Sequence, residues 1–177
     1  MNRKILAVVL ALLAIAGAGG FLLYSPGRVS MSIKDPPPQP YDSSITAITV
    51  TFSKIDIHSA GAGNDSGWHT IMTSGTVNLL TVLNVSKVLG TASIPAGKYT
   101  EIRFFISQAI VTIGGVNVAY SVPSANQTGF KVPITGGGLQ VTGGLSASVQ
   151  LDLAFRNSEI MNNVNLALTP VATATVG

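Results

Sequence analysis

The residues of this sequence best suited to chemistry are its two histidines, which flank a glycine-rich loop. The strands predicted at 48–58 and 68–72 can pair as a hairpin around that loop, which would bring His58 close to His69. Asp56 precedes His58 by two residues and therefore belongs to the same face of a strand. Two imidazoles and a carboxylate can hold zinc or copper, so these three residues form a candidate metal site.

A second interpretation of the same residues is structural. The histidines and Asp56 would then be solvent-facing polar groups beside the loop, with Trp68 contributing to the core. No other pattern points to catalysis, because the sequence has no G-x-S-x-G motif and no cysteine. The glycine-rich segment at 135–138 lacks the lysine and helix that follow a phosphate-binding loop. We therefore expect no enzymatic activity and no cofactor.

Outward-facing aromatic residues would indicate a glycan-binding or ligand-binding module. Arg103 and Phe105 have the opposite parity to the apolar residues Ile102 and Phe104, so they face outward if this segment is a strand. An alternative role for Arg103 is an ion pair with Glu101 on the same strand. The two residues keep a ligand-binding module among the candidate functions.

Three asparagines stand in N-x-Ser/Thr sequons, which are acceptors for N-linked glycans in exported proteins. They are Asn64, Asn84 and Asn126, each in a predicted loop or at the end of a strand. The sequence therefore predicts three candidate glycosylation sites.

Alternating apolar and polar residues predict strands along most of the chain. The alternation is clearest from Leu145 to Phe155, and a change of phase near Ser53 predicts a β-bulge. The predicted strands are 28–34, 44–59 as a pair or one bent strand, 68–72, 98–113, 116–122, 130–134, 139–141, 145–155 and a last one that begins at 164, while 76–83 fits a short strand or a turn. About eight to ten short strands without a long helix predict an all-β fold, an antiparallel β-sandwich of the immunoglobulin-like or prealbumin-like kind.

Residues 1–24 have the composition of a targeting or anchoring sequence. Two basic residues precede an uncharged apolar run at 5–24, which is long enough to cross a bilayer as one transmembrane helix. The same run fits a cleavable signal peptide, with small residues at 14–18. In both interpretations a linker at 25–27 leads to a β-sandwich domain at 28–177. The basic residues keep the N-terminus inside, so we expect this domain outside the cytoplasm. It would be held at the cell membrane by a single transmembrane helix, or be secreted or lie on the cell surface if the signal is cleaved.

The charge of the chain narrows the choice of partners. Of its ten basic residues, two lie before the apolar run, which leaves eight basic against seven acidic residues in the remainder. Nucleic-acid binding needs a cluster of basic residues, and no such cluster is present. Nucleic acid is therefore excluded as a partner. The 10 % of charged residues and the 19 glycines are typical of β structure with many turns.

Several segments taken in order resemble one known family. They are VSMSIKDPP at 29–37, ITVTFSKIDIH at 48–58, GW at 67–68, VNLL at 77–80, IPAGKYTEIRF at 94–104, VPS at 122–124 and LALTPV at 166–171. Together they resemble the family called domain of unknown function 4382. The resemblance implies a small exported prokaryotic domain, anchored by a signal segment or a lipid, with no established activity. Because the apolar run is followed by no cysteine for a lipid, a membrane helix is the expected anchor.

Three classes of function follow from these observations. The first is a membrane-tethered domain outside the cytoplasm with a structural, adhesive or interaction role, in contact with the membrane through residues 5–24. The second is a subunit of a cell-surface filament, in which the segment 21–33 adds as a strand to the sheet of a neighbour. The third is a glycan-binding or ligand-binding module. The expected partners are the membrane, a second copy of the chain, and a surface protein or glycan.

Overall fold

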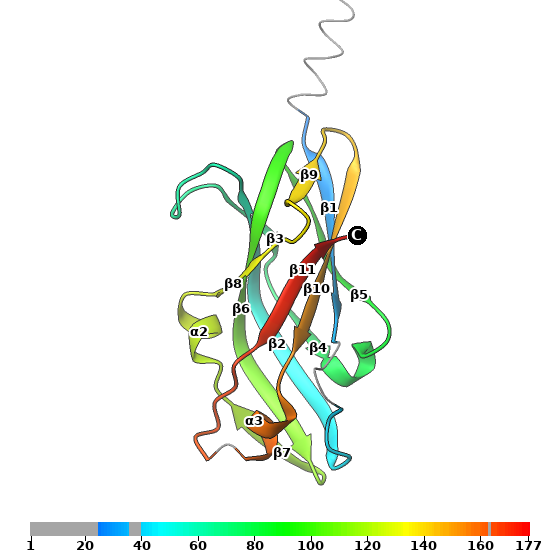
Figure 1. The fold of residues 1–177 in the computed structure, drawn as a ribbon, viewed down its shortest axis with the longest axis vertical. Helices are drawn as coiled ribbons and strands as arrows, with labels where there is room; N and C mark the ends of the chain where they lie inside the picture. The colour runs from blue at the N-terminus through cyan, green and yellow to red at the C-terminus, as the bar shows by residue number, and fades with distance from the viewer. Residues whose placement is uncertain (1–24, 36–39, 163) are drawn as a thin grey trace, which may run out of the picture.

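The computed structural model describes residues 25–35, 40–162 and 164–177. The N-terminal helix and the signal sequence predicted at 1–24 lie outside these residues. Two β-sheets are stacked face to face, with their strands running roughly along the long axis of the molecule (Figure 1). The predicted all-β sandwich is confirmed. In the part of the chain described, no helix is both long enough and apolar enough to cross a membrane.

The smaller sheet has four strands in the order β11-β10-β1-β5. Their bounds are β1 (Gly27–Lys34), β5 (Lys87–Ile94), β10 (Ser146–Ala154) and β11 (Val171–Val176). β1 pairs antiparallel with β5 but parallel with β10. The prediction of a purely antiparallel sandwich is wrong at this pair, because side chains alternate with the same period in parallel and antiparallel strands.

The larger sheet has seven strands, with β3-β2-β6-β7 as its main path, β4 paired to β2, and both β8 and β9 paired to β6. Its strands are β2 (Ile45–Ser59), β3 (Trp68–Met72), β4 (Gly75–Asn78), β6 (Gly97–Ile113), β7 (Val116–Tyr120), β8 (Phe130–Pro133) and β9 (Leu139–Val141). The short helices are the 3-10 helix η1 (Leu79–Val82), α2 (Pro123–Gln127) and α3 (Asn157–Met161). The long strands β2 and β6 form the centre of this sheet.

One hydrophobic core fills the space between the sheets. Ile55 and Ile57 of β2 and Ile102 and Phe104 of β6 have no exposed surface. The Phe104 ring meets the Phe52 ring edge to face, with 6.1 Å between the ring centroids. Burying each such side chain contributes about 1.5–3 kcal/mol. Since these residues alternate along their strands, the residues between them are directed to the opposite, solvent-facing side.

The bulge predicted near Ser53 is confirmed. The register of β2 against β6 shifts between Thr51 and Phe52 and again between Phe52 and Lys54. After the shift, Lys54 and Asp56 occupy the outer face of the sheet. The bulge therefore determines which side chains of β2 reach the site described below.

Two strands differ from the sequence prediction. β5 was not predicted, because Gly90 and Ala92 interrupt its pattern and only Ile94 among its residues is buried. The final strand begins at Val171 rather than at 164. Leu166 adopts a φ of 49°, in the left-handed region that no extended strand contains. The ambiguous segment 76–83 divides between the end of β4 and η1, and the Asn78 side chain caps η1 by accepting from the Leu80 N–H.

Candidate functional site

The register of the larger sheet brings polar and aromatic side chains together on its outer face. Asp56 of β2 is paired with Arg103 of β6, and Arg103 is paired with Lys131 of β8. In the adjacent row, Lys54 is paired with Phe105. Residues directly opposite each other point to the same side of a sheet, so these side chains form one patch. We name it the Arg103 cluster and define it as Lys54, Asp56, Trp68, Glu101, Arg103, Phe105 and Lys131.

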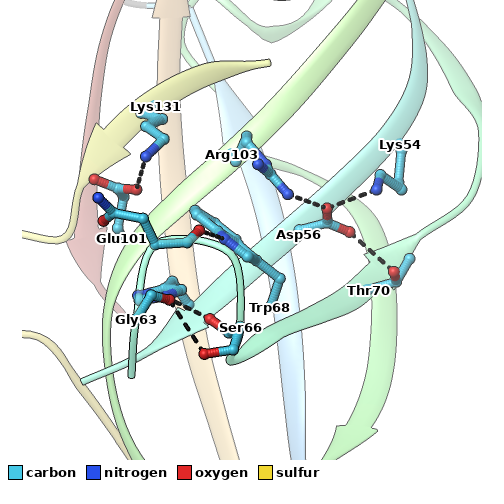
Figure 2. A network of polar contacts seen from close by, with 11 residues as sticks. Lys54, Asp56, Gly63, Ser66, Trp68, Thr70, Glu101, Arg103 and Lys131 are labelled. Atoms are coloured by element: carbon cyan, nitrogen blue, oxygen red, sulfur yellow. Dashed lines mark hydrogen bonds and ion pairs between the residues drawn. The ribbon is translucent and has the colours of Figure 1, made fainter. Parts of the chain in front are cut away.

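Asp56 is the buried centre of the Arg103 cluster, with 1 % of its surface exposed. Its Oδ2 atom lies 2.9 Å from Lys54 Nζ and 3.5 Å from Arg103 Nη2. Its Oδ1 atom accepts a hydrogen bond of 2.9 Å from the Thr70 hydroxyl (Figure 2). A buried carboxylate is tolerated only when it is paired and hydrogen-bonded, and these three partners meet that condition.

Arg103 lies against two aromatic rings. Its Cζ atom is 4.0 Å from the centroid of the Trp68 ring and 5.2 Å from that of Phe105. Cation–π attraction of this kind contributes about 0.5–2 kcal/mol, the more so where water is excluded. The Arg103 Nε atom is buried and has no hydrogen-bond partner among the described residues. The side chain as a whole remains 21 % exposed, so Arg103 is held in place without being fully buried.

The loop between β2 and β3 folds back onto Trp68. The indole Nε1–H donates a 2.8 Å hydrogen bond to the Asn64 carbonyl. The His58 ring lies 4.5 Å from the Trp68 ring, and His58 Nε2 lies 3.1 Å from the Gly63 carbonyl and 2.8 Å from the Ser66 carbonyl. Because carbonyl oxygens only accept, His58 Nε2 carries the proton and donates to both. His58 therefore fixes the loop that positions Trp68.

The predicted metal site is not assembled. His58 is paired with Trp68, and His69 is paired with Ile57, so the two histidines lie on opposite faces of the sheet. His69 Nε2 contacts the Ser59 hydroxyl at 3.2 Å, away from Asp56. The prediction of a shared face is wrong because the actual register differs from the assumed one by a residue. The described residues contain no group of three or more His, Cys, Asp or Glu side chains placed to hold a metal ion.

The two carboxylates of the Arg103 cluster are not shared equally among its three basic residues. Glu101 Oε1 lies 3.5 Å from Lys131 Nζ. Glu101 is therefore paired with a lysine on the neighbouring strand, and not with Arg103 as the sequence alone suggests. Lys54 forms the short contact to Asp56. With three cations and two carboxylates, the cluster has a net charge of +1. Arg103 carries that excess, because its one carboxylate contact among the described residues is long and is shared with Lys54.

The residue pattern indicates that Arg103 and Phe105 face outward, but it does not single out Lys54 and Lys131 as their neighbours. Lys54 lies two residues before Asp56 in β2, so the alternation of the strand places both side chains on the same face. This spacing is the signal by which Lys54 could have been found. Lys131 alternates with apolar neighbours in β8, but nothing in the sequence indicates that β8 pairs with β6.

The three candidate glycosylation sites are accessible. Asn64, Asn84 and Asn126 are all exposed, the first in the loop over Trp68, the second after η1 and the third in α2. Glycan attachment at these residues remains a prediction.

The two stacked sheets and the polar outer face of the larger one define a β-sandwich domain. The chain belongs to the family described as Domain of unknown function (DUF4382), whose model matches residues 26–170. The resemblance noted from the sequence is thereby confirmed. No curated protein matches the sequence.

A crystal structure of a proposed cell adhesion protein from Bacteroides fragilis is similar to this chain, with 11 % sequence identity and a TM-score of 0.33. The similarity covers 86 % of this chain and 45 % of that one. This chain therefore spans less than half the length of that protein.

Proposed function

We propose that the protein is a non-catalytic binding domain, tethered outside the cytoplasm by residues 5–24, and that it engages a surface partner through the Arg103 cluster. The observation that carries this proposal is the position of the Arg103 side chain. It lies against two aromatic rings and a buried carboxylate, and 21 % of its surface is still exposed.

Such an arrangement is suited to binding because its side chains lose little freedom when a partner arrives. Arginine and tryptophan are also the residues most often responsible for binding energy at interfaces. Asp56 and the loop carbonyls that hold Trp68 in place are satisfied within the domain itself. The Arg103 cluster is thus preorganised rather than formed on contact.

The tether is supported by the sequence and by the place where the fold begins. The apolar run ends at residue 24, and β1 begins at Gly27. Only a short linker separates the two, which would keep the domain close to the membrane. The filament alternative requires 21–33 to pair with a neighbour, but 27–34 already pairs with β5 and β10 of its own domain. A tethered binding domain is therefore the better supported function.

The test uses bacterial cells that produce the full chain. Protease added outside intact cells should remove the domain, and the cells should adhere to at least one member of a panel of immobilised glycans and surface proteins. Phe105→Thr removes an aromatic ring of the Arg103 cluster and should abolish the adhesion. Ile110→Thr, on the same face of β6 but outside the cluster, is the matched control and should leave it unchanged.

Two results would overturn the proposal. The first is a domain that the external protease cannot reach in intact cells. The second is adhesion that responds equally to the Phe105→Thr and Ile110→Thr substitutions, or adhesion to no member of the panel.

A further inference from the structure

We infer that the partner of the Arg103 cluster is an acidic polysaccharide, whose carboxylate groups bind the Arg103 guanidinium. This inference rests on the proposed function and adds the chemical class of the ligand. Its first support is the charge of the cluster, and its second is the position of the cluster within the sheet.

The charge argument starts from the two lysines, whose carboxylate partners are already supplied. Lys54 lies 2.9 Å from Asp56, and Lys131 lies 3.5 Å from Glu101. Arg103 is left with one long contact, through Nη2, to a carboxylate that Lys54 also neutralises. A guanidinium has five N–H donors and matches the geometry of a carboxylate better than any other cation does. An additional carboxylate is therefore the group that this site lacks.

The position of Arg103 within the sheet leaves no place beside it for a peptide that binds by strand addition. At Arg103, β6 is paired with Asp56 of β2 on one side and with Lys131 of β8 on the other, so the backbone at this residue is already paired. A ligand on this face must be held by side chains alone. That condition suits a flat polymer that offers carboxylates, hydroxyls and C–H faces along its length.

The same sheet face offers groups that complement a sugar chain. Phe105 is half-buried and presents an aromatic ring in the middle of the face. Thr51 and Thr76 place their hydroxyl oxygens 3.2 Å apart, and the Ser107 hydroxyl donates to the Thr51 carbonyl, all outside the cluster on neighbouring strands. Aromatic rings pack against sugar C–H faces, and hydroxyls exchange hydrogen bonds with sugar hydroxyls.

An anionic membrane surface is a weaker fit than a polysaccharide. Attraction to anionic lipid grows with the number of basic residues near the surface, and the net charge of the Arg103 cluster is only +1. Electrostatics alone would not hold this face against a bilayer. The experiment nevertheless includes such a surface, so that the two anionic sources are distinguished.

The experiment measures binding of the full chain, reconstituted in nanodiscs of neutral lipid, to three probes. These are polygalacturonate, the same polymer with its carboxyl groups methyl-esterified, and vesicles rich in phosphatidylserine. We expect binding to polygalacturonate that weakens as salt rises, and no comparable binding to the other two probes. A hydrogen bond to a charged group contributes about 1.5–3 kcal/mol, so Arg103→Gln should weaken binding roughly 10- to 100-fold.

The variants separate a binding role from a structural one. Arg103→Lys keeps the charge but not the planar fork and should give an intermediate affinity. Lys131→Gln brings the net charge of the Arg103 cluster to zero without touching Asp56, so it tests the electrostatic argument even if Arg103→Gln fails to fold. Lys87→Gln on β5 removes an exposed cation from the other sheet and should change the affinity less than twofold.

The outcomes distinguish this inference from the proposed function. Equal affinity for the esterified polymer, a preference for the vesicles, or undiminished binding by both Arg103→Gln and Lys131→Gln would overturn the inference. If adhesion to another member of the panel still depends on Phe105, the proposed binding function stands and only the ligand class is wrong.

Discussion

The hydroxyl of Tyr41 joins the end of β1 to the end of β10. It donates a 3.0 Å hydrogen bond to Asp35 Oδ2 and accepts one of 3.3 Å from the Phe155 N–H. Asp35 has no exposed surface, and its own N–H donates to the Val82 carbonyl. Burial raises the pKa of Asp35 to about 7, and the hydrogen bond from Tyr41 only partly opposes this effect. Burial, followed by the charge of Asp35, raises the pKa of Tyr41.

The first prediction concerns stability and pH. The pKa of Asp35 is about 7 in the folded chain against 3.8 for a free side chain, so between these values the folded state binds one more proton. Stability must therefore fall as pH rises from about 4 to about 7, and level off above. The variant Asp35→Asn cannot titrate and should lack this component. Thermal melts measure this difference: between pH 4.5 and pH 8, the Tm of the wild type should fall by at least about 5 °C more than the Tm of Asp35→Asn.

Tyr41→Phe is the companion variant for this measurement. It leaves the Phe155 N–H without its acceptor and removes the bond that lowers the pKa of Asp35. We expect a stability loss of about 1–3 kcal/mol and a pH dependence displaced to higher pH. Parallel pH profiles for the wild type and Asp35→Asn would show that Asp35 ionises normally.

The second prediction compares two members of one ion pair. Asp56→Asn leaves Lys54 and Arg103 without their shared carboxylate at a buried position, and should cost about 2–4 kcal/mol. Lys54→Met removes a side chain that is 42 % exposed and should cost less than about 1 kcal/mol. Urea unfolding measures both values. Equal costs would mean that Asp56 depends mainly on Lys54 rather than on the whole network.

The third prediction concerns Gly129, which packs on the Arg103 cluster. Its φ is 76°, and a Cβ atom there would lie 2.5 Å from Arg103 Cγ and 2.9 Å from Phe105 Cζ. Gly129→Ala should therefore displace the stacked side chains and cost about 2–4 kcal/mol. Gly144 has a φ of 74° with open space around it, so Gly144→Ala has the backbone strain alone and should cost about 1–2 kcal/mol.

Fluorescence gives a second reading of the same pair of variants. Trp68 is the one tryptophan in the chain, and Arg103 covers its ring. The emission of Trp68 should change in Gly129→Ala and stay constant in Gly144→Ala. Unchanged emission in both variants would indicate that Arg103 does not rest on the indole in solution.

The fourth prediction concerns metal binding. Because His58 and His69 occupy opposite faces of the sheet, zinc titrated into the full chain should produce no heat of binding below millimolar concentration. Copper should behave in the same way. A micromolar affinity that disappears in His58→Gln would show that the hairpin rearranges to bring the histidines together.

Much of the fold could be predicted from the sequence, because side chains buried on one face of a strand leave a period of two. β1, β6 and β10 were found in this way, and so was the bulge at Ser53. β5 could not be found because little of it is buried. The parallel pairing of β1 with β10 could not be found either, because strand direction leaves no mark on alternation.

The site was less predictable than the fold, because it depends on register. The outward direction of Arg103 can be predicted from the alternation of residues in its strand. Its neighbours cannot, because Asp56 lies 47 residues earlier in the chain and Lys131 belongs to another strand, β8. The position of His69 depends on a shift of one residue in the β2–β3 hairpin. Such a shift reverses the face of every side chain on the strand.

The interior position of β1 determines how the domain would carry tension. The chain enters the fold at Gly27 and runs directly between β5 and β10. A pull on the N-terminal side therefore acts along β1 and shears two hydrogen-bonded ladders at once, whereas a strand at the edge of a sheet would peel away bond by bond. A partner held on the opposite sheet would transmit its load through the core to this strand. The first strand of the domain is thus held on both of its sides by the sheet to which it belongs.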